Sequence, residues 1–186
     1  MSMEEEKGTS LYVELDDIIH STDLDEVSAE SSNTFDNLPD GYYLTEVIES
    51  KLTRSKSSDK PMVTLRLAVV GNGYNLSEDG TNFEPIENVA KRNLWKHYVI
   101  KDGNSFKRFV SDMLKFEGET PNEPMLPKEA WTDSTTLEAS IGVLSQVNAR
   151  IYVHLETRKN SLTGESSQWT SLESFKRAEA LGLPVD

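Results

Sequence analysis

The alternation of apolar and polar side chains along the chain predicts a series of short β-strands. Residues 62–70 and 146–157 carry apolar side chains at every second position, which is the period of a strand with one buried face. Residues 42–52 follow this period less strictly, and two further strands are expected at residues 89–100 and 167–172. The apolar face expected for residues 42–52 consists of Tyr42, Leu44, Ile48 and Leu52.

One segment has a helical period instead. Apolar side chains recur at i, i+3, i+4, i+7 and i+8, which places them on one face of a helix; they are Phe106, Phe109, Val110, Met113 and Leu114. We expect Asn104 or Ser105 to cap the N-terminus of this helix and Gly118 to end it. Residues 130–143 favour one or two short helices. Residues 174–181 favour a small terminal helix that stops at Gly182.

The order of these elements predicts a mainly β protein with minor α content. Residues 71–88 contain three glycines and a proline, so they are expected to form a loop. Five short strands then remain, with one helix between the third and the fourth. This order is typical of a five-stranded β-barrel of OB type.

The charge is unevenly distributed and divides the chain into two parts. The 186 residues hold 19 bases and 32 acids, a net charge of −13. Residues 1–40 alone hold one base and twelve acids, whereas residues 41–186 hold 18 bases and 20 acids. We therefore predict an acidic, flexible arm at residues 1–37, followed by the OB-type domain at residues 38–186.

The arm has two interpretations that the sequence leaves open. Acidic and apolar residues alternate in Leu11–Ile19, a pattern that can become ordered against a partner. The arm is either a solubilising tail or edge strand, or an interaction arm whose charge mimics nucleic acid.

Several classes of protein are excluded by composition. The chain has no cysteine, which rules out disulfides and cysteine-ligated metal sites. It lacks an apolar run of about 18 residues and an apolar N-terminal signal, so we expect a cytoplasmic protein without a membrane partner. Its histidines, His20, His97 and His154, show no metal-ligand spacing, so no metal and no cofactor is predicted.

One sequence pattern imitates a two-metal nuclease. Pro39-Asp40 followed by Glu49-Ser50-Lys51 matches the order of that signature. However, Asp40 and Glu49 lie at the two ends of one predicted strand, which separates them by roughly 30 Å. Carboxylates so far apart cannot share a metal, so we expect a protein without catalytic activity.

Positive charge in the body is concentrated in three stretches. Residues 51–66 hold five bases, residues 91–108 hold six and residues 150–159 hold three. Aromatic side chains lie among them, and basic grooves with aromatic platforms suit single-stranded nucleic acid. Strand parity places Tyr43 and Tyr152 on polar faces, so we expect these two rings to be exposed and to stack on bases.

The opening of the body resembles a known family. Leu38-Pro39-Asp40-Gly41-Tyr42-Tyr43, a strand, the basic turn Thr53-Arg54-Ser55-Lys56-Ser57 and a returning strand are similar to small early proteins of tailed phages. The resemblance covers roughly residues 38–172. It implies an OB-fold single-stranded-DNA-binding or recombination-associated protein of the host cell cytoplasm, encoded near replication genes. The chain departs from many such binders because its acidic segment is N-terminal.

The sequence as a whole predicts a non-sequence-specific single-stranded-DNA-binding protein that supports phage DNA replication or recombination. The arm would compete for the empty groove and contact replication or recombination proteins, and oligomers are compatible with this function. The alternative is a protein-interaction or DNA-mimic inhibitor module that acts through the arm. The predicted DNA-binding residues are Tyr43, Lys51, Arg54, Lys56, Arg66, Arg92, Trp95, Lys96, Arg150, Tyr152, Arg158 and Trp169.

Overall fold

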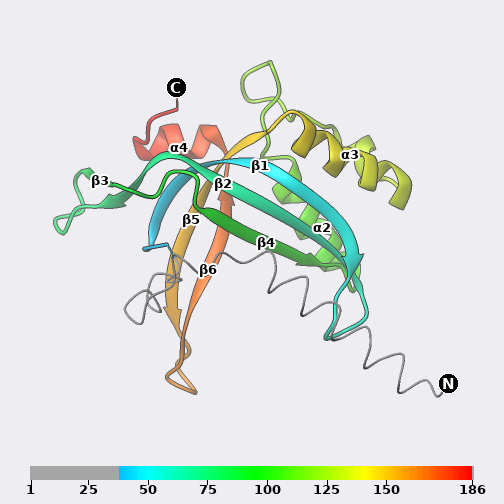
Figure 1. The fold of residues 1–186 in the computed structure, drawn as a ribbon, viewed down its shortest axis with the longest axis horizontal. Helices are drawn as coiled ribbons and strands as arrows, with labels where there is room; N and C mark the ends of the chain where they lie inside the picture. Colours follow the sequence, from blue (N-terminus) through cyan, green and yellow to red (C-terminus); the bar gives the residue numbers. More distant parts are fainter. Residues whose placement is uncertain (1–37, 186) are drawn as a thin grey trace, which may run out of the picture. The chain divides into compact units, whose positions relative to one another are not determined.

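The computed structural model describes residues 38–185, and these form a mainly β protein with six strands and three α-helices (Figure 1). The strands are β1 (Gly41–Arg54), β2 (Pro61–Leu76), β3 (Phe83–Ile86), β4 (Asn93–Val99), β5 (Arg150–Lys159) and β6 (Ser166–Glu173). The helices are α2 (Gly103–Met113), α3 (Ser134–Gln146) and α4 (Phe175–Leu181), and a 3₁₀ turn, Lys128–Trp131, precedes α3. No helix in this part of the chain is long and apolar enough to cross a bilayer.

All strand pairs are antiparallel and belong to one open sheet. The sheet order is β3-β2-β1-β5-β6, and β4 pairs with the same edge of β2 that β3 uses further along. Within the described residues no backbone ladder joins β4 to β6, so closure into a barrel is not seen. The strand count also differs from the expected five, because the segment predicted as a loop contains β3.

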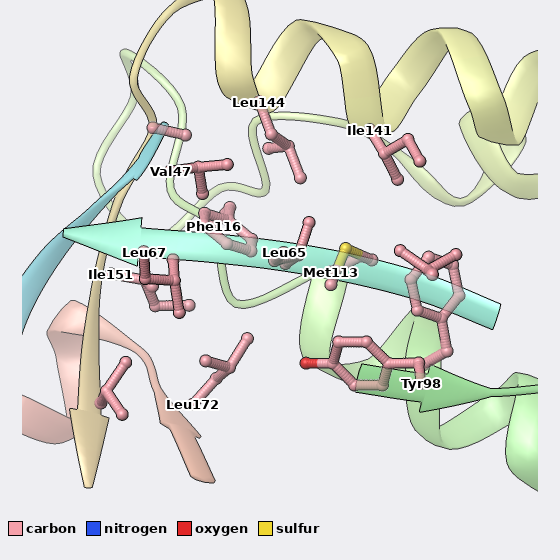
Figure 2. Packing of buried hydrophobic residues seen from close by; sticks show 14 of the residues in the cluster. Val47, Leu65, Leu67, Tyr98, Met113, Phe116, Ile141, Leu144, Ile151 and Leu172 are labelled. Atoms are coloured by element: carbon pink, nitrogen blue, oxygen red, sulfur yellow. The ribbon is translucent and has the colours of Figure 1, made fainter. Parts of the chain in front are cut away.

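The core lies between one face of the sheet and the helices α2 and α3. Figure 2 shows Ile141 and Leu144 of α3 pointing toward Leu65 of β2, with Met113 of α2 beside them. All four side chains are almost completely buried. We call this side of the sheet the inner face and the opposite side the outer face.

A second, smaller cluster covers part of the outer face. Ala178 of α4 and Leu183 after it pack on Tyr152 of β5, with Tyr42 and Leu44 of β1 at the margin. The start of β1 is therefore covered on both sides. This corrects the predicted face of the strand: Tyr43 and Val47 are fully buried in the main core, whereas Tyr42 and Leu44 are only half-buried.

The helix ends differ in part from the prediction. Asp102, and not Asn104 or Ser105, is the N-cap of α2, and its side chain accepts a hydrogen bond from the Ser105 backbone N–H. The side chain of Ser105, the third helical residue, accepts a hydrogen bond from the Asp102 backbone N–H, which completes a capping box. The helix ends at Met113, before the predicted stop at Gly118. In α4 the prediction is confirmed, because Gly182 closes the helix in the left-handed conformation.

The loop predicted for residues 71–88 is wrong. β2 continues to Leu76, and Phe83–Ile86 returns along it as β3. The glycines of this segment serve the strand. Gly71 has a φ of 74° beside a bulge in the β1–β2 pairing, and Gly73 pairs with Tyr43. A Cβ atom on Gly73 would lie 2.3 Å from the ring of Tyr43, so the buried ring requires glycine at this position.

We predict that Gly73→Ala lowers the free energy of unfolding by about 1–3 kcal/mol, because the added methyl collides with a ring that has no space to move. Urea unfolding measured by far-UV circular dichroism tests this. Gly142→Ala is the matched control. Nothing lies within 4 Å of a Cβ placed there in α3, so this change should stabilise the protein by up to about 1 kcal/mol. Equal stabilities for the two variants would contradict the prediction.

Candidate nucleic-acid interface

Two exposed tryptophans lie on edge strands of the sheet, and each is accompanied by an arginine. Trp95 of β4 is 51% exposed and Trp169 of β6 is 53% exposed. The guanidinium carbon of Arg66 lies 5.7 Å from the ring centroid of Trp95. That of Arg158 lies 5.1 Å from the ring of Trp169. We call these four residues the tryptophan–arginine pairs.

Strand register explains why these side chains meet. Trp95 is paired directly with Arg66 across the β4–β2 ladder, so both point to the outer face. Trp169 is paired with Glu156 of β5, and Arg158 lies two residues further on the same face of that strand. Both rings alternate with neighbours that point into the core, such as Tyr98 and Leu172.

Carboxylates orient the cations of this surface. Glu49 of β1 lies 3.1 Å from Arg66 Nε and 2.7 Å from Lys51 Nζ. The hydrogen bond from Lys51 lowers the pKa of Glu49, so this carboxylate stays ionised. Glu156 accepts hydrogen bonds of 3.0 Å and 2.9 Å from Arg158. Each arginine is thus held beside its ring, and a phosphate that binds there must exchange with a carboxylate.

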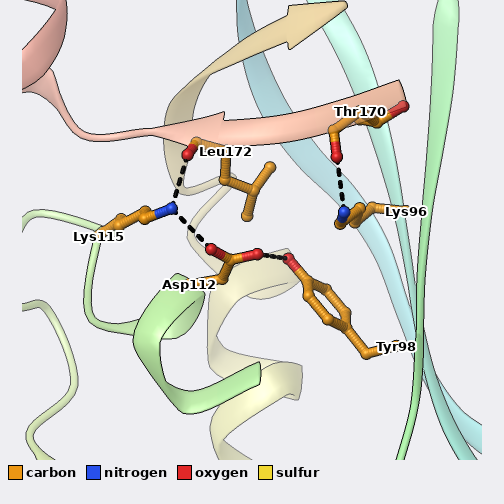
Figure 3. A network of polar contacts seen from close by, with 6 residues as sticks. All are labelled: Lys96, Tyr98, Asp112, Lys115, Thr170 and Leu172. Carbon is orange, nitrogen blue, oxygen red and sulfur yellow. Dashed lines mark hydrogen bonds and ion pairs between the residues drawn. The ribbon is translucent and has the colours of Figure 1, made fainter. Parts of the chain in front are cut away.

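Two lysine side chains bind the backbone of β6, one from the edge strand β4 and one from the segment after α2. Lys96 Nζ of β4 donates a hydrogen bond of 2.6 Å to the carbonyl oxygen of Thr170 in β6. Lys115, just after α2, donates 2.8 Å to the carbonyl of Leu172 and contacts Asp112 at 2.7 Å (Figure 3). Burial lowers the pKa of Lys96. We call these two lysine–carbonyl contacts the seam.

The seam relates the two tryptophans to each other. Trp95 precedes Lys96 in the chain, and Trp169 precedes Thr170. Each tryptophan is therefore the chain neighbour of one of the two residues that form the Lys96–Thr170 hydrogen bond. The sequence prediction placed Lys96 in a DNA groove, but its amino group is half-buried and occupied in the seam. Its contribution here is to hold the two edge strands together.

The prediction that the rings of Tyr43 and Tyr152 are exposed is wrong. Tyr43 is fully buried, and its hydroxyl donates a hydrogen bond to the carbonyl of Pro39. Tyr152 is 1% exposed, packs edge-on against Phe175 of α4, and donates a hydrogen bond to the carbonyl of Pro184. Strand parity did place Tyr152 on the outer face, but α4 covers that face.

The remaining predicted bases lie in other places. Arg54 and Lys56 are exposed in the β1–β2 hairpin, where Arg54 donates a hydrogen bond of 3.0 Å to the carbonyl of Asp59. Arg92 is half-buried just before β4, and Arg150 is exposed at the start of β5. The structure therefore brings together Lys51 with the Arg66–Trp95 pair, and separately Arg158 with Trp169. The predictions for the acidic arm, residues 1–37, concern residues outside the described part of the chain.

Sequence reasoning missed the seam altogether. Lys115 was not singled out, and its partner is a backbone carbonyl 57 positions away. No side-chain pattern announces such a bond. The sequence does indicate that Trp95 is exposed, because Trp95 and the polar His97 are two positions apart and so share one face of the strand. No protein-family model matches the chain, and no characterised protein is significantly similar to it.

The buried tyrosines predict an alkaline loss of stability. Burial raises the pKa of Tyr43 and of Tyr152 from 10.0 to about 12. The unfolded chain therefore releases these protons first, and stability should be complete below pH 10 and fall as the pH rises from 10 toward 12. Urea unfolding from about pH 8 to about pH 11.5 measures this. Tyr43→Phe and Tyr152→Phe should each flatten the decline, and an unchanged slope in both would contradict the prediction.

The seam predicts that removal of the Lys115 amino group lowers the stability of the fold. Lys115→Met leaves the Leu172 carbonyl without its donor and removes the cation beside Asp112, so we expect a loss of about 1–3 kcal/mol in the free energy of unfolding. Lys107→Met, at an exposed position of α2, is the control and should change stability by less than about 0.5 kcal/mol. Chemical denaturation compares them, and similar values would argue against the seam.

Proposed function

We propose that this protein binds single-stranded DNA without sequence specificity and has no catalytic activity, and that its sheet is an opened barrel of OB type. The observation that carries the proposal is the presence of two half-exposed tryptophans, each held beside an arginine, next to the seam. Unpaired bases stack on exposed aromatic rings, and guanidinium groups neutralise the phosphates between them.

The electrostatics of the body favour local over long-range attraction. Residues 41–186 carry 18 bases and 20 acids, so the body as a whole does not attract a polyanion. Binding then depends on short-range contacts at Lys51, Arg66 and Arg158. Each of these cations already contacts a glutamate, so DNA replaces one anionic partner with another. Moderate affinity with a marked salt dependence follows from this arrangement.

The mechanism assigns separate tasks to the two side chains of each pair. The arginine covers part of the indole ring, and the exposed half of the tryptophan is offered to a base. An arginine next to a stacked base adds a cation–π contribution and reaches the adjoining phosphate. Neither contact reads a base edge by hydrogen bonding, so the strand is held without preference for its sequence.

Fluorescence anisotropy with the full-length protein and a labelled oligo-dT tests the proposal. Trp95→Ala and Trp169→Ala should each weaken binding by about 1–3 kcal/mol, the value of one stacked base. Leu76→Ala is the control, because this leucine is equally exposed, at 50%, on a part of β2 away from the pairs. Arg158→Gln should reduce the dependence of log affinity on log salt by about 0.7, whereas Lys128→Gln should leave it unchanged.

The competitor and the folding controls complete the design. Duplex DNA should compete poorly, because stacked and paired bases are not available to the indole rings. Thermal unfolding verifies that each variant is folded. The proposal fails if the wild-type protein does not bind oligo-dT at low salt, or if both tryptophan variants bind it as well as the wild type.

A further inference from the structure

One apolar side chain is almost completely exposed at the tip of the β5–β6 hairpin. Leu162 is 94% exposed, whereas the other large apolar side chains on the surface of residues 38–185 reach at most 56%. Hydrogen bonds order the backbone of this tip. The side-chain oxygen of Asn160 accepts them from the N–H groups of Leu162, at 2.8 Å, and Thr163, at 3.3 Å. The leucine is therefore presented to solvent by an ordered turn.

The β5–β6 hairpin extends beyond the end of its neighbouring strand. β1 pairs with β5 only as far as Gly41, which lies opposite Leu155. From there to Lys159 and Ser166, β5 and β6 pair only with each other in the described part of the chain, over roughly 13 Å. Figure 1 shows this two-stranded arm projecting from the sheet. An arm of this kind can reach into another molecule.

An apolar cavity of about 520 Å³ lies at the other end of β1. Its apolar walls are Leu52, Pro61, Ile100, Phe106, Trp131 and Leu137. Trp131 and Leu137 are buried, whereas Leu52, Ile100 and Phe106 are half-buried. The volume falls within the range of about 300–1,000 Å³ typical of ligand sites. An apolar group that entered would remove more of the half-buried side chains from water.

The tip and the cavity are matched in polarity and charge. Residues 160–164 at the tip carry no charge, and one base and one acid, Lys159 and Glu165, flank them. The cavity lining also holds one base and one acid, Arg54 and Asp133, together with three hydroxyl side chains. Neither surface has a net charge, so an uncharged apolar anchor suits the cavity and the two surfaces do not repel each other.

Leu162 and the cavity lie at opposite ends of one molecule. The arm begins beyond Gly41 at the start of β1, whereas Leu52 and Arg54 at the end of β1 line the cavity. The strand between Gly41 and Leu52 spans roughly 36 Å along its length. Figure 1 shows the tip of the arm far from the β1–β2 hairpin. Leu162 can therefore reach such a cavity only in a second copy.

We propose that Leu162 of one copy inserts into the cavity of a second copy, so that copies of this protein associate head to tail. Each copy offers one tip and one cavity, so the contact is heterologous and an open assembly can add further copies. A contact made by a hairpin tip is smaller than the roughly 1,200 Å² of stable interfaces, so it is weak and forms at high concentration. The inference does not depend on DNA binding.

Sedimentation velocity of the full-length protein without DNA tests the association, at up to about 1 mM protein. Salt of about 0.15 M screens the repulsion between chains of net charge −13. The sedimentation coefficient of the wild type should rise with concentration. Leu162→Ser removes the anchor, and Ser134→Phe fills the cavity from an exposed lining position; each should weaken association by about tenfold or more. Leu76→Ser, at another exposed leucine, is the control and should associate like the wild type.

A mixture of the two variants gives the sharper test. Leu162→Ser keeps an open cavity, and Ser134→Phe keeps the leucine at its tip. Equal amounts should therefore form a dimer with one copy of each variant. This dimer should add no further copies, because it has neither a free anchor nor an open cavity. Circular dichroism of each variant verifies that its fold is retained.

Several outcomes overturn the proposal. The wild type remains monomeric up to about 1 mM; or Leu162→Ser associates as strongly as the wild type; or the mixed variants do not associate although the wild type does. The last two results would assign the association to another surface. Binding of an uncharged apolar dye in the cavity, without association of copies, would assign the cavity to a small apolar ligand.

Discussion

The structure depends on the hydrogen bonds that the backbone carbonyl groups of β6 accept at the free edge of this strand. A strand at the edge of a sheet presents carbonyl groups that need a hydrogen-bond donor. In this protein the donors for Thr170 and Leu172 are two lysine ammonium groups, one from β4 and one from the segment just after α2. This solution links β4 and the segment after α2 to the last strand of the sheet. Trp95 and Trp169 are the chain neighbours of Lys96 and Thr170, so both tryptophans lie next to a residue of one hydrogen bond between β4 and β6.

A network behind the seam extends this constraint into the core. The carboxylate of Asp112 accepts hydrogen bonds from Lys115 Nζ, at 2.7 Å, and from the hydroxyl of Tyr98, at 2.8 Å. Burial and this carboxylate raise the pKa of Tyr98 well above its ordinary value, so the phenol remains a donor. The same lysine therefore fixes a strand edge and the end of a helix. A single charged side chain connects the surface that we assign to DNA with the packing behind it.

Local patterns predicted the regular parts of the fold, and their failures have physical causes. The alternation in residues 62–70 and the helical period around Phe109 are local, and both elements formed. Tyr152 failed because α4, which follows it in the chain by more than twenty residues, covers a face that parity alone leaves open. The glycines of residues 71–88 predict a loop, whereas Gly71 permits a bulge and Gly73 accommodates the Tyr43 ring. The tryptophan–arginine pairs needed the strand register, which no single strand contains.

The contact between Gly73 and Tyr43 has a consequence for how the sheet assembles. The start of β1 is apolar on both faces, so burial alone distinguishes poorly between neighbouring alignments with β2. A slip of one residue would place Asn72 or Tyr74 opposite the Tyr43 ring, where only a residue without a side chain fits. Gly73 therefore favours the observed alignment of β1 with β2 over the alignments shifted by one residue.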